Sequence, residues 1–230
     1  MSFLTLESMD IGEEINALRH SLEASSDAEN ALAMSRYMKG HFQYLGIKSP
    51  ERKAIAAPFL KSWAPLCAKN PEALVKALWN QNEREYQYIA MEFLARSKKD
   101  WNPHRLDLYH HLLVYKPWWD TVDMISATLV GGLIQKFPEL EERMEEWNAS
   151  GHLWLIRCSL LYQLKYGKDM DLERLSTNIL RHSDSKEFFI QKAMGWSLRQ
   201  AAKFHTEWVY HFVTMNSLPA LTKREALKHY

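Results

Sequence analysis

Helix starts recur along this chain at intervals in the mid-thirties, and this recurrence restricts the fold more than any other feature. Apolar spacing and punctuating residues predict that successive second helices begin near Arg84, Trp118, Leu153, Lys186 and Lys223. The intervals are 34, 35, 33 and 37 residues. Two helices per period of this length are typical of an α-solenoid, in which each helix pair buries its apolar face against its neighbours. We therefore predict one all-α domain, with an irregular helical bundle as the alternative.

The chain also predicts two helices ahead of this array. Apolar residues from Ile11 to Leu22 follow at steps of four, three and four, which is the spacing of one helical face. Residues 27–39 predict a second, shorter helix, with Ser25 and Ser26 as its N-cap. We expect residues 1–230 to form a single repeat domain in which the helices at about 4–39 act as an N-terminal cap.

Proline and glycine mark several later positions. Ser49 is the expected N-cap of a helix that has Pro50 at its first position, and Asn-Pro pairs predict helix starts near residues 71 and 103. Gly131 and Gly132 fall inside a predicted helix, where glycine is unfavourable. We expect these two glycines to permit close helix packing rather than to bind phosphate.

Charge is divided unevenly along the chain. Residues 1–149 hold 17 basic and 21 acidic side chains, a net charge of −4, whereas residues 150–230 hold 12 and 7, a net charge of +5. The C-terminal third is therefore a candidate surface for a polyanion such as nucleic acid. An ordinary solvated face is the alternative.

The repeat places several chemically distinctive residues at the same phase. Trp119 and Asp123 are four apart, so they share one side of a helix. Relative to Asp123, the equivalent positions in neighbouring repeats are Tyr88, Arg157 and Lys192. Equivalent positions of stacked helices line up along one surface, usually the concave one. We expect these residues to line a groove, which Trp196, Arg199 and Lys203 extend at helical spacing.

Other kinds of site lack their sequence patterns. The chain has ten histidines but no HExxH motif, and it has no phosphate loop or dinucleotide fingerprint, so we expect no metal and no cofactor. Its two cysteines, Cys67 and Cys158, predict reduced core thiols rather than a disulfide. Acidic residues soon follow the first four residues, and no apolar run is long enough to span a bilayer. We expect a protein of the bacterial-type cytoplasm that does not enter a membrane.

Six segments of the chain resemble the AlkD-type DNA alkylation repair glycosylases, which are built from HEAT-like repeats. The segments are RYMK (36–39), LGIKSPER (45–52), WWDTVD (118–123), LWLIR (153–157), SKEFFIQKAMGW (185–196) and LTKREA (221–226). They cover nearly all of the chain from about residue 31. The resemblance implies a right-handed α-α superhelix of HEAT-like repeats with a concave basic groove.

The resemblance also implies an activity and its residues. The activity is excision of positively charged N3- and N7-alkylated purines, such as 3-methyladenine and 7-methylguanine, from double-stranded DNA without extruding the base into a pocket. Asp123 would be the catalytic carboxylate, Trp119 and Trp196 would wall the deoxyribose, and Arg157 would contact the phosphate backbone. Further substrate and DNA contacts would come from Tyr37, Lys48, Ser49, Phe189, Lys192, Arg199, Lys203 and Arg224. Lys48 departs from the polar, uncharged residue that the family often has there, which puts the DNA affinity of that loop in doubt.

The chemistry of the residues is consistent with this activity. An alkylated purine is already a good leaving group, so one carboxylate that stabilises an oxocarbenium-like sugar could suffice. The alternatives are that Trp196 belongs to the core and that Arg199 and Lys203 are ordinary surface charges. At the level of the whole protein, the alternatives are a non-catalytic solenoid that binds nucleic acid by shape and a protein-interaction scaffold. We expect a monomer.

Overall fold

The computed structural model describes residues 10–96 and 98–228, except for the side chains of residues 67–69. Within these residues the regular structure is helical, and the one β-type pairing is an isolated bridge between Gln43 and Glu83. The all-α prediction is therefore confirmed. Contacts divide the chain into two compact units, residues 1–101 and 102–230. Residues 4–9 of the predicted cap and the Cys67 side chain lie outside the described residues.

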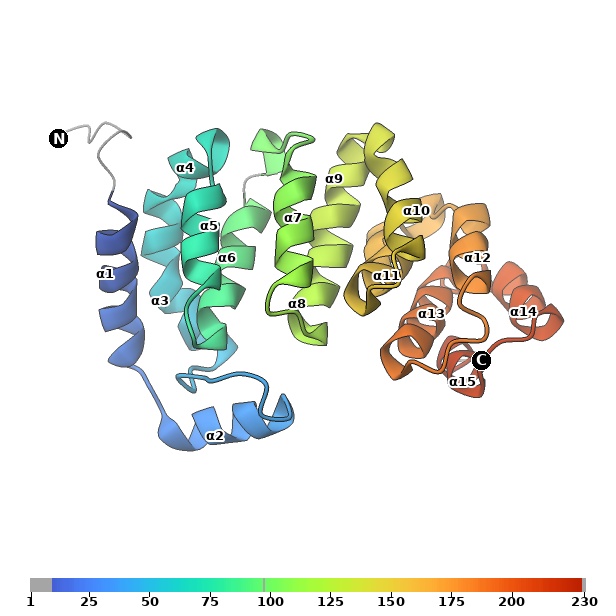
Figure 1. Ribbon diagram of the computed structural model, residues 1–230, viewed down its shortest axis with the longest axis horizontal. Helices are drawn as coiled ribbons and strands as arrows, with labels where there is room; N and C mark the ends of the chain where they lie inside the picture. Colours follow the sequence, from blue (N-terminus) through green and yellow to red (C-terminus); the bar gives the residue numbers. More distant parts are fainter. Residues whose placement is uncertain (1–9, 97, 229–230) are drawn as a thin grey trace. The chain divides into compact units, whose positions relative to one another are not determined.

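The described residues of unit 1 form six α-helices. They are α1 (Ile11–Glu23), α2 (Ala28–Tyr37), α3 (Ser49–Ser62), α4 (Ala64–Lys69), α5 (Glu72–Trp79) and α6 (Arg84–Arg96), followed by the 3₁₀ turn η2 (Lys98–Asp100). Helix α1 packs against α3 and α5, and α5 packs against α6. Figure 1 shows α2 lying crosswise at the lower end of α3 and α6, unlike the upright helices around it.

Two predicted caps in unit 1 are wrong by one or two residues. The N-cap of α2 is Asp27 rather than Ser25 or Ser26, and its carboxylate accepts a hydrogen bond from the Asn30 backbone N–H. Helix α3 already includes Ser49, so Lys48 occupies the N-cap position. An ionised Asp at a helix N-terminus satisfies a free N–H and also interacts favourably with the helix dipole, which favours it over a neighbouring serine.

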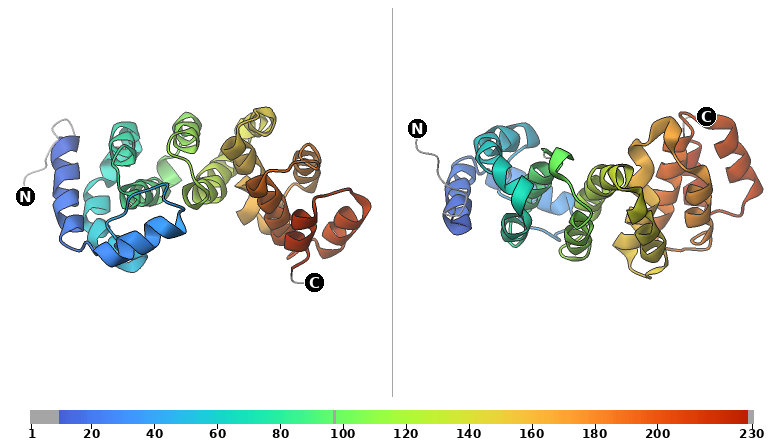
Figure 2. Two further views of the ribbon diagram at one scale, coloured as in Figure 1. Left: turned by 60° about the horizontal axis from the view of Figure 1, so that its bottom comes forward. Right: turned by 90° about the horizontal axis from the view of Figure 1, so that it is seen from above.

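Unit 2 consists of successive helix pairs, which Figures 1 and 2 show in three orientations. The α-helices are α7 (Arg105–Val114), α8 (Trp119–Met124), α9 (Gly131–Lys136), α10 (Glu142–Ala149), α11 (Leu153–Leu161), α12 (Leu172–Leu180), α13 (Phe188–Ala201), α14 (Thr206–Met215) and α15 (Ala220–Ala226). The π-helical segment η3 (Ile125–Val130) joins α8 to α9, and the 3₁₀ segments are η4 (Pro138–Glu141), η5 (Tyr162–Lys165) and η6 (Gly167–Asp169). Helix α11 contacts α8 on one side and α13 on the other.

The predicted period agrees with the observed second helices of successive pairs. Helices α6, α8, α11 and α13 begin at Arg84, Trp119, Leu153 and Phe188, each within two residues of the prediction. The last start is less accurate, because α15 begins at Ala220, three residues before the predicted position. Pro219 directly precedes α15, and a proline at this place is a local start signal that the prediction of residue 223 did not use.

Gly131, one of the two glycines in the middle of unit 2, has the packing role that the sequence indicates. A Cβ built on Gly131 would lie 2.1 Å from the Tyr162 carbonyl oxygen, closer than atoms can approach. Gly131 therefore allows α9 to lie directly against η5. It follows the π-helical segment η3, which begins two residues after Asp123. A π-helical insertion shifts the phase of the helix that follows it, and such insertions are frequent near functional sites.

The core of unit 2 is continuous across its last five α-helices. Buried apolar residues of α11, α12, α13, α14 and α15 form one cluster, which includes Leu160, Ile179, Met194 and Phe212. Cys158 is buried and reduced, and burial raises the pKa of its thiol to about 12. Among the described residues, no helix is both long and apolar enough to cross a bilayer.

Candidate functional site

The site is built around an ion pair between Asp123 on α8 and Arg157 on α11. Arg157 Nε donates to Asp123 Oδ1 at 2.7 Å, and Nη2 donates to Oδ2 at 2.9 Å. Two parallel N–H to oxygen bonds of this kind fix both the position and the plane of a carboxylate. The predicted phase equivalence of these two residues, 34 apart in the chain, is therefore a direct contact in the structure.

Arg157 joins three successive second helices. Besides its bonds to Asp123 on α8, Arg157 Nη1 donates to the backbone carbonyl of Phe189 on α13. Only 5% of Arg157 is exposed, and its guanidinium also lies 5.7 Å from the centre of the Phe189 ring. Its bound groups are protein atoms, so the phosphate contact expected of Arg157 stays a prediction.

Three aromatic rings form a cluster next to this ion pair. Trp118, Trp154 and Phe189 contact one another with ring centres 5.0 to 5.6 Å apart. Trp154 is buried, whereas Phe188 extends from the cluster and is exposed. The cluster occupies the N-terminal ends of α8, α11 and α13, the same helices that Arg157 connects. It gives the ion pair an apolar neighbourhood.

Burial and the ion pair act on the Asp123 carboxyl in opposite directions. Burial raises its pKa above the ordinary carboxyl value, and the Arg157 guanidinium lowers it. The pKa remains raised on balance, because desolvation is the larger effect. The side chain of Asp123 nevertheless keeps 15% of its surface exposed, more than twice the 6% of Arg157. Asp123 is thus the partner that a bound molecule can reach.

The two tryptophans of the predicted site occupy different settings. Trp119 is the first residue of α8, one turn before Asp123 on the same helix, and it is partly buried. Trp196 lies in the middle of α13, where it is partly exposed and partly packed against the apolar core of unit 2. Trp196 is therefore only in part a core residue, and its role as a wall of the site stays a prediction.

Glu225 of α15 neutralises two of the predicted DNA-binding side chains. Its carboxylate binds Lys192 Nζ and Arg199 Nη1, both at 2.9 Å. These two hydrogen bonds lower the pKa of Glu225 to about 2. The spacing of Thr222 and Glu225 predicts a capping box at a helix start near residue 223, and this interpretation missed the ion pairs of Glu225. The capping box is wrong, because α15 begins two residues before Thr222, whose hydroxyl donates to the Gln191 carbonyl.

The remaining predicted contacts are exposed but are split between the two units. Lys203 and Arg224 lie on the surface of unit 2. Tyr37, Lys48 and Ser49 lie on the surface of unit 1. The predicted groove, which needs residues of both units, stays a prediction. Among the described residues, no group of three or more His, Cys, Asp or Glu side chains is arranged to hold a metal ion.

Comparisons with known proteins agree with this arrangement of helices. The family model of the DNA alkylation repair enzymes matches residues 18–230. A solved structure, described as a predicted DNA alkylation repair enzyme from Enterococcus faecalis, has a TM-score of 0.83 and 29% sequence identity. The similarity covers 89% of this chain and 96% of that one. A comparison with curated proteins found no match. The family match spans nearly the whole chain, and we conclude that this protein belongs to the DNA alkylation repair enzyme family.

Proposed function

We propose that the protein is a DNA glycosylase that removes positively charged N3- and N7-alkylated purines from double-stranded DNA. One observation carries the proposal. A member of a DNA alkylation repair family holds a partly exposed carboxylate, Asp123, in a fixed orientation beside an aromatic cluster. A protein that only bound DNA or another protein has no use for a partly desolvated carboxylate there, because DNA would repel it.

The reaction is hydrolysis of the C1′–N bond. An alkyl group on N3 or N7 gives the purine a positive charge, so the base departs as a neutral molecule with the electron pair of that bond. The deoxyribose then carries the positive charge, as the sugar does in glycoside hydrolysis. The Asp123 carboxylate stabilises this charge and orients a water molecule, whose oxygen bonds to C1′ and whose proton passes to solvent. The products are the free base and an abasic site.

Arg157 acts in this scheme as a positioning residue. Its two bonds hold the Asp123 carboxylate in one plane and leave the remaining lone pairs of both oxygens for water or sugar. Trp119 and Trp196 would supply aromatic faces toward the deoxyribose, which favour cationic character in a neighbouring group. Both tryptophans keep part of their surface exposed, as this role requires.

The proposed partner is duplex DNA bound mainly through its phosphates. Lys203 and Arg224 are exposed cations on unit 2, and Lys48 is one on unit 1. Such contacts are independent of sequence, so binding should weaken steeply with salt. We propose that the protein acts as a monomer in the cytoplasm, without a metal ion or cofactor.

Incubation with methylated duplex DNA tests the proposal directly. Chromatography should show 3-methyladenine or 7-methylguanine released by the native protein, and Asp123→Asn should release neither while still binding the duplex. Asp120→Asn is the matched control, because it removes a carboxylate one turn away on the same helix. If Asp123→Asn released bases as fast as the native protein, the proposed role of this carboxylate would be wrong. Salt-sensitive binding without any base release would instead identify a non-catalytic DNA-binding protein.

A further inference from the structure

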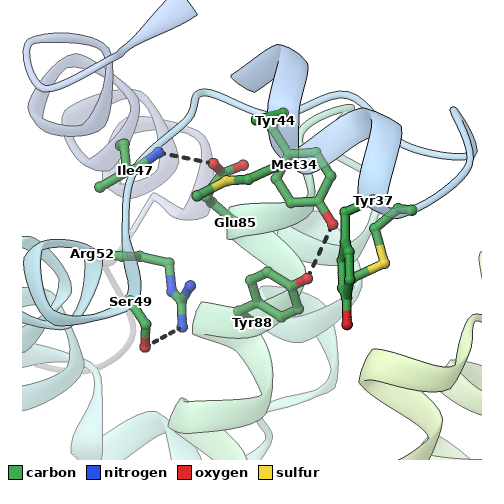
Figure 3. Close-up of a pocket in the computed structure, with 10 residues that line it drawn as sticks. Met34, Tyr37, Tyr44, Ile47, Ser49, Arg52, Glu85 and Tyr88 are labelled. Atoms are coloured by element: carbon green, nitrogen blue, oxygen red, sulfur yellow. Dashed lines mark hydrogen bonds between the residues drawn. The ribbon is translucent and has the colours of Figure 1, made fainter. Parts of the chain in front are cut away.

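Unit 1 contains a pocket that the proposed glycosylase reaction does not use. Its volume is about 500 Å³, within the range of small-molecule sites, and its lining is mostly apolar. Three tyrosines, Tyr37, Tyr44 and Tyr88, stand around it in Figure 3, together with Met34. The other lining residues are Ala33, Met38, Ile47, Ser49, Arg52 and Glu85. The pocket therefore offers aromatic faces and thioethers, which suit a flat ring.

Two buried polar groups line this pocket with hydrogen-bonding capacity left over. Glu85 is fully buried; its Oε1 accepts the backbone N–H groups of Gly46 and Ile47, at 2.9 and 3.3 Å, whereas Oε2 has no hydrogen-bond partner among the described residues. Arg52 is 8% exposed, and its Nε likewise has no partner there. A buried carboxylate oxygen without a partner costs free energy. The lining of this pocket thus contains one acceptor, Glu85 Oε2, and one donor, Arg52 Nε, that make no hydrogen bond within the described residues.

A structural role explains only one of the two oxygens of the Glu85 carboxylate. Oε1 holds the turn at Gly46, whose positive φ and close approach to the Asp27 carbonyl exclude any side chain at that position. A glutamine would serve this turn equally well, since its amide oxygen also accepts hydrogen bonds. The second oxygen of Glu85 therefore remains unexplained by the fold. Burial also raises the pKa of this carboxyl.

The surroundings of the pocket favour a neutral ring over a cation. The Arg52 guanidinium already lies over the Tyr88 ring, 4.7 Å from its centre, so it covers an aromatic face that a cationic ligand would use. A neutral ring needs instead aromatic faces to stack on and polar groups at its edge, and all of these are present. Glu85 is fully buried, so a ligand can reach its carboxylate only if neighbouring lining side chains move slightly. Met34 and Met38 have flexible, unbranched side chains that permit such a movement.

We propose that this pocket binds a neutral nucleobase, which stacks among Tyr37, Tyr44 and Tyr88 and presents an N–H edge to Glu85. A carboxylate oxygen favours bases with N–H donors on that edge, of which guanine has the most. A base with this chemistry could reach the pocket in two forms, as a free nucleobase or nucleoside or as an unpaired nucleotide of DNA.

Methyl NMR of the full-length protein, labelled at its methionines, distinguishes the two forms. Met34 and Met38 line the pocket, so their methyl signals report occupancy. The first arm titrates guanosine, adenosine, cytidine and thymidine. The second titrates an undamaged duplex that contains one unpaired guanine, against the same duplex with an abasic residue at that position. Shifts with guanosine alone would identify a site for free bases. Shifts that need the unpaired base in DNA would identify a site for a displaced nucleotide.

Two pocket variants and one control make the assignment specific. Tyr37→Ala should weaken binding of the base about tenfold or more, the usual loss for one stacking ring. Tyr37 is 70% exposed, so this variant should fold. Glu85→Gln keeps an acceptor for the Gly46 turn but places an amide N–H₂ beside the ligand, so guanosine should lose about tenfold relative to cytidine. Tyr210→Ala removes a similarly exposed tyrosine outside the pocket and should change nothing.

Either of two results would overturn the proposal. One is the absence of Met34 and Met38 shifts with both saturating nucleoside and unpaired-guanine DNA. The other is shifts that persist unchanged in both Tyr37→Ala and Glu85→Gln. The readout is binding and needs no base release, so a protein that proved inactive as a glycosylase would still report on this pocket. Conversely, an empty pocket would leave the proposed chemistry at Asp123 standing.

Discussion

The Asp123 carboxylate is held in a single plane by Arg157, through bonds of 2.7 and 2.9 Å between residues 34 positions apart. The two side chains come from the second helices of neighbouring repeats, so stacking of the repeats itself creates the contact. A carboxylate held in this way loses rotational freedom before any substrate arrives. That preorganisation is what electrostatic stabilisation of a transition state requires.

Arg157→Lys should therefore impair catalysis more than binding. A lysine keeps the positive charge but is a point donor that cannot bind both oxygens in a plane. We expect single-turnover base release to slow by up to about 100-fold, the loss that a small misplacement of a catalytic group can cause, with little change in DNA affinity. The control is Arg199→Lys, which keeps a cation beside Glu225 and should change the rate less. Equal loss of affinity and rate in Arg157→Lys would instead favour a phosphate contact.

The rate of base release should fall at acidic pH as Asp123 becomes protonated. Because burial raises the Asp123 pKa, the midpoint of this fall should lie above the ordinary Asp value of about 3.9. The contribution of Asp123 to the free energy of unfolding changes with pH in the opposite direction to the rate. A raised pKa means that the folded state favours the protonated form, so this stabilisation is present at low pH and is lost as pH rises through the raised pKa. A single-turnover pH profile checks the prediction, and a midpoint below the ordinary value would contradict it.

Glu225→Gln should destabilise the protein at neutral pH but not at strongly acidic pH. The Glu225 pKa is lowered to about 2, so its stabilisation is present above the unfolded value near 4.3 and is lost as pH falls toward 2. Partial exposure of Lys192 and Arg199 screens the pairs, and we expect roughly 1–2 kcal/mol at pH 7. Urea unfolding at pH 7 and pH 2 measures the difference. A destabilisation that is equal at both pH values would show a packing effect instead.

The same substitution should also change DNA binding. Removing the Glu225 charge releases Lys192 and Arg199 from neutralisation, so these cations become able to bind phosphates. We expect tighter binding at low salt, and a steeper dependence of log affinity on log salt by about one or two phosphate contacts. Fluorescence anisotropy across a salt series checks this. Glu207→Gln removes an exposed carboxylate of neighbouring α14 and is the matched control. An unchanged slope would show that neither cation lies at the DNA surface.

Gly131→Ala should destabilise unit 2 by about 3 kcal/mol, the upper end of overpacking costs. Its Cβ would meet a backbone carbonyl, that of Tyr162, at 2.1 Å, and a backbone atom cannot rotate aside. Gly12→Ala is the control, because Gly12 is an exposed helical glycine that meets only the Asp10 side chain. There the substitution should be neutral or slightly stabilising. Thermal unfolding of both variants decides the comparison, and equal midpoints would show that the helices separate readily.

The unevenness of the sequence predictions has physical causes. Starts such as Arg84 and Leu153 were correct because helical periodicity and capping are local properties that neighbouring residues determine. The role of Glu225 was missed because it depends on α13, a helix about 30 residues earlier in the chain. The start of α15 was predicted three residues too late although Pro219 marks it locally. Lys192 and Glu225 are 33 residues apart, close to one repeat, just as Asp123 and Arg157 are. This spacing is the signal that could have identified the contact between Lys192 and Glu225.

The sequence by itself determined the helical repeat, its period and the common phase of Trp119, Asp123 and Arg157. These follow from 3.6-residue periodicity and from local helix signals, which need no knowledge of distant parts of the chain. Only the tertiary structure decided which charges at that phase face solvent and which bind each other. Arg157 binds Asp123, whereas Lys192 and Arg199 bind Glu225. The repeat phase places residues in order along one surface. The distances between packed helices decide which of these charged residues form an ion pair with each other.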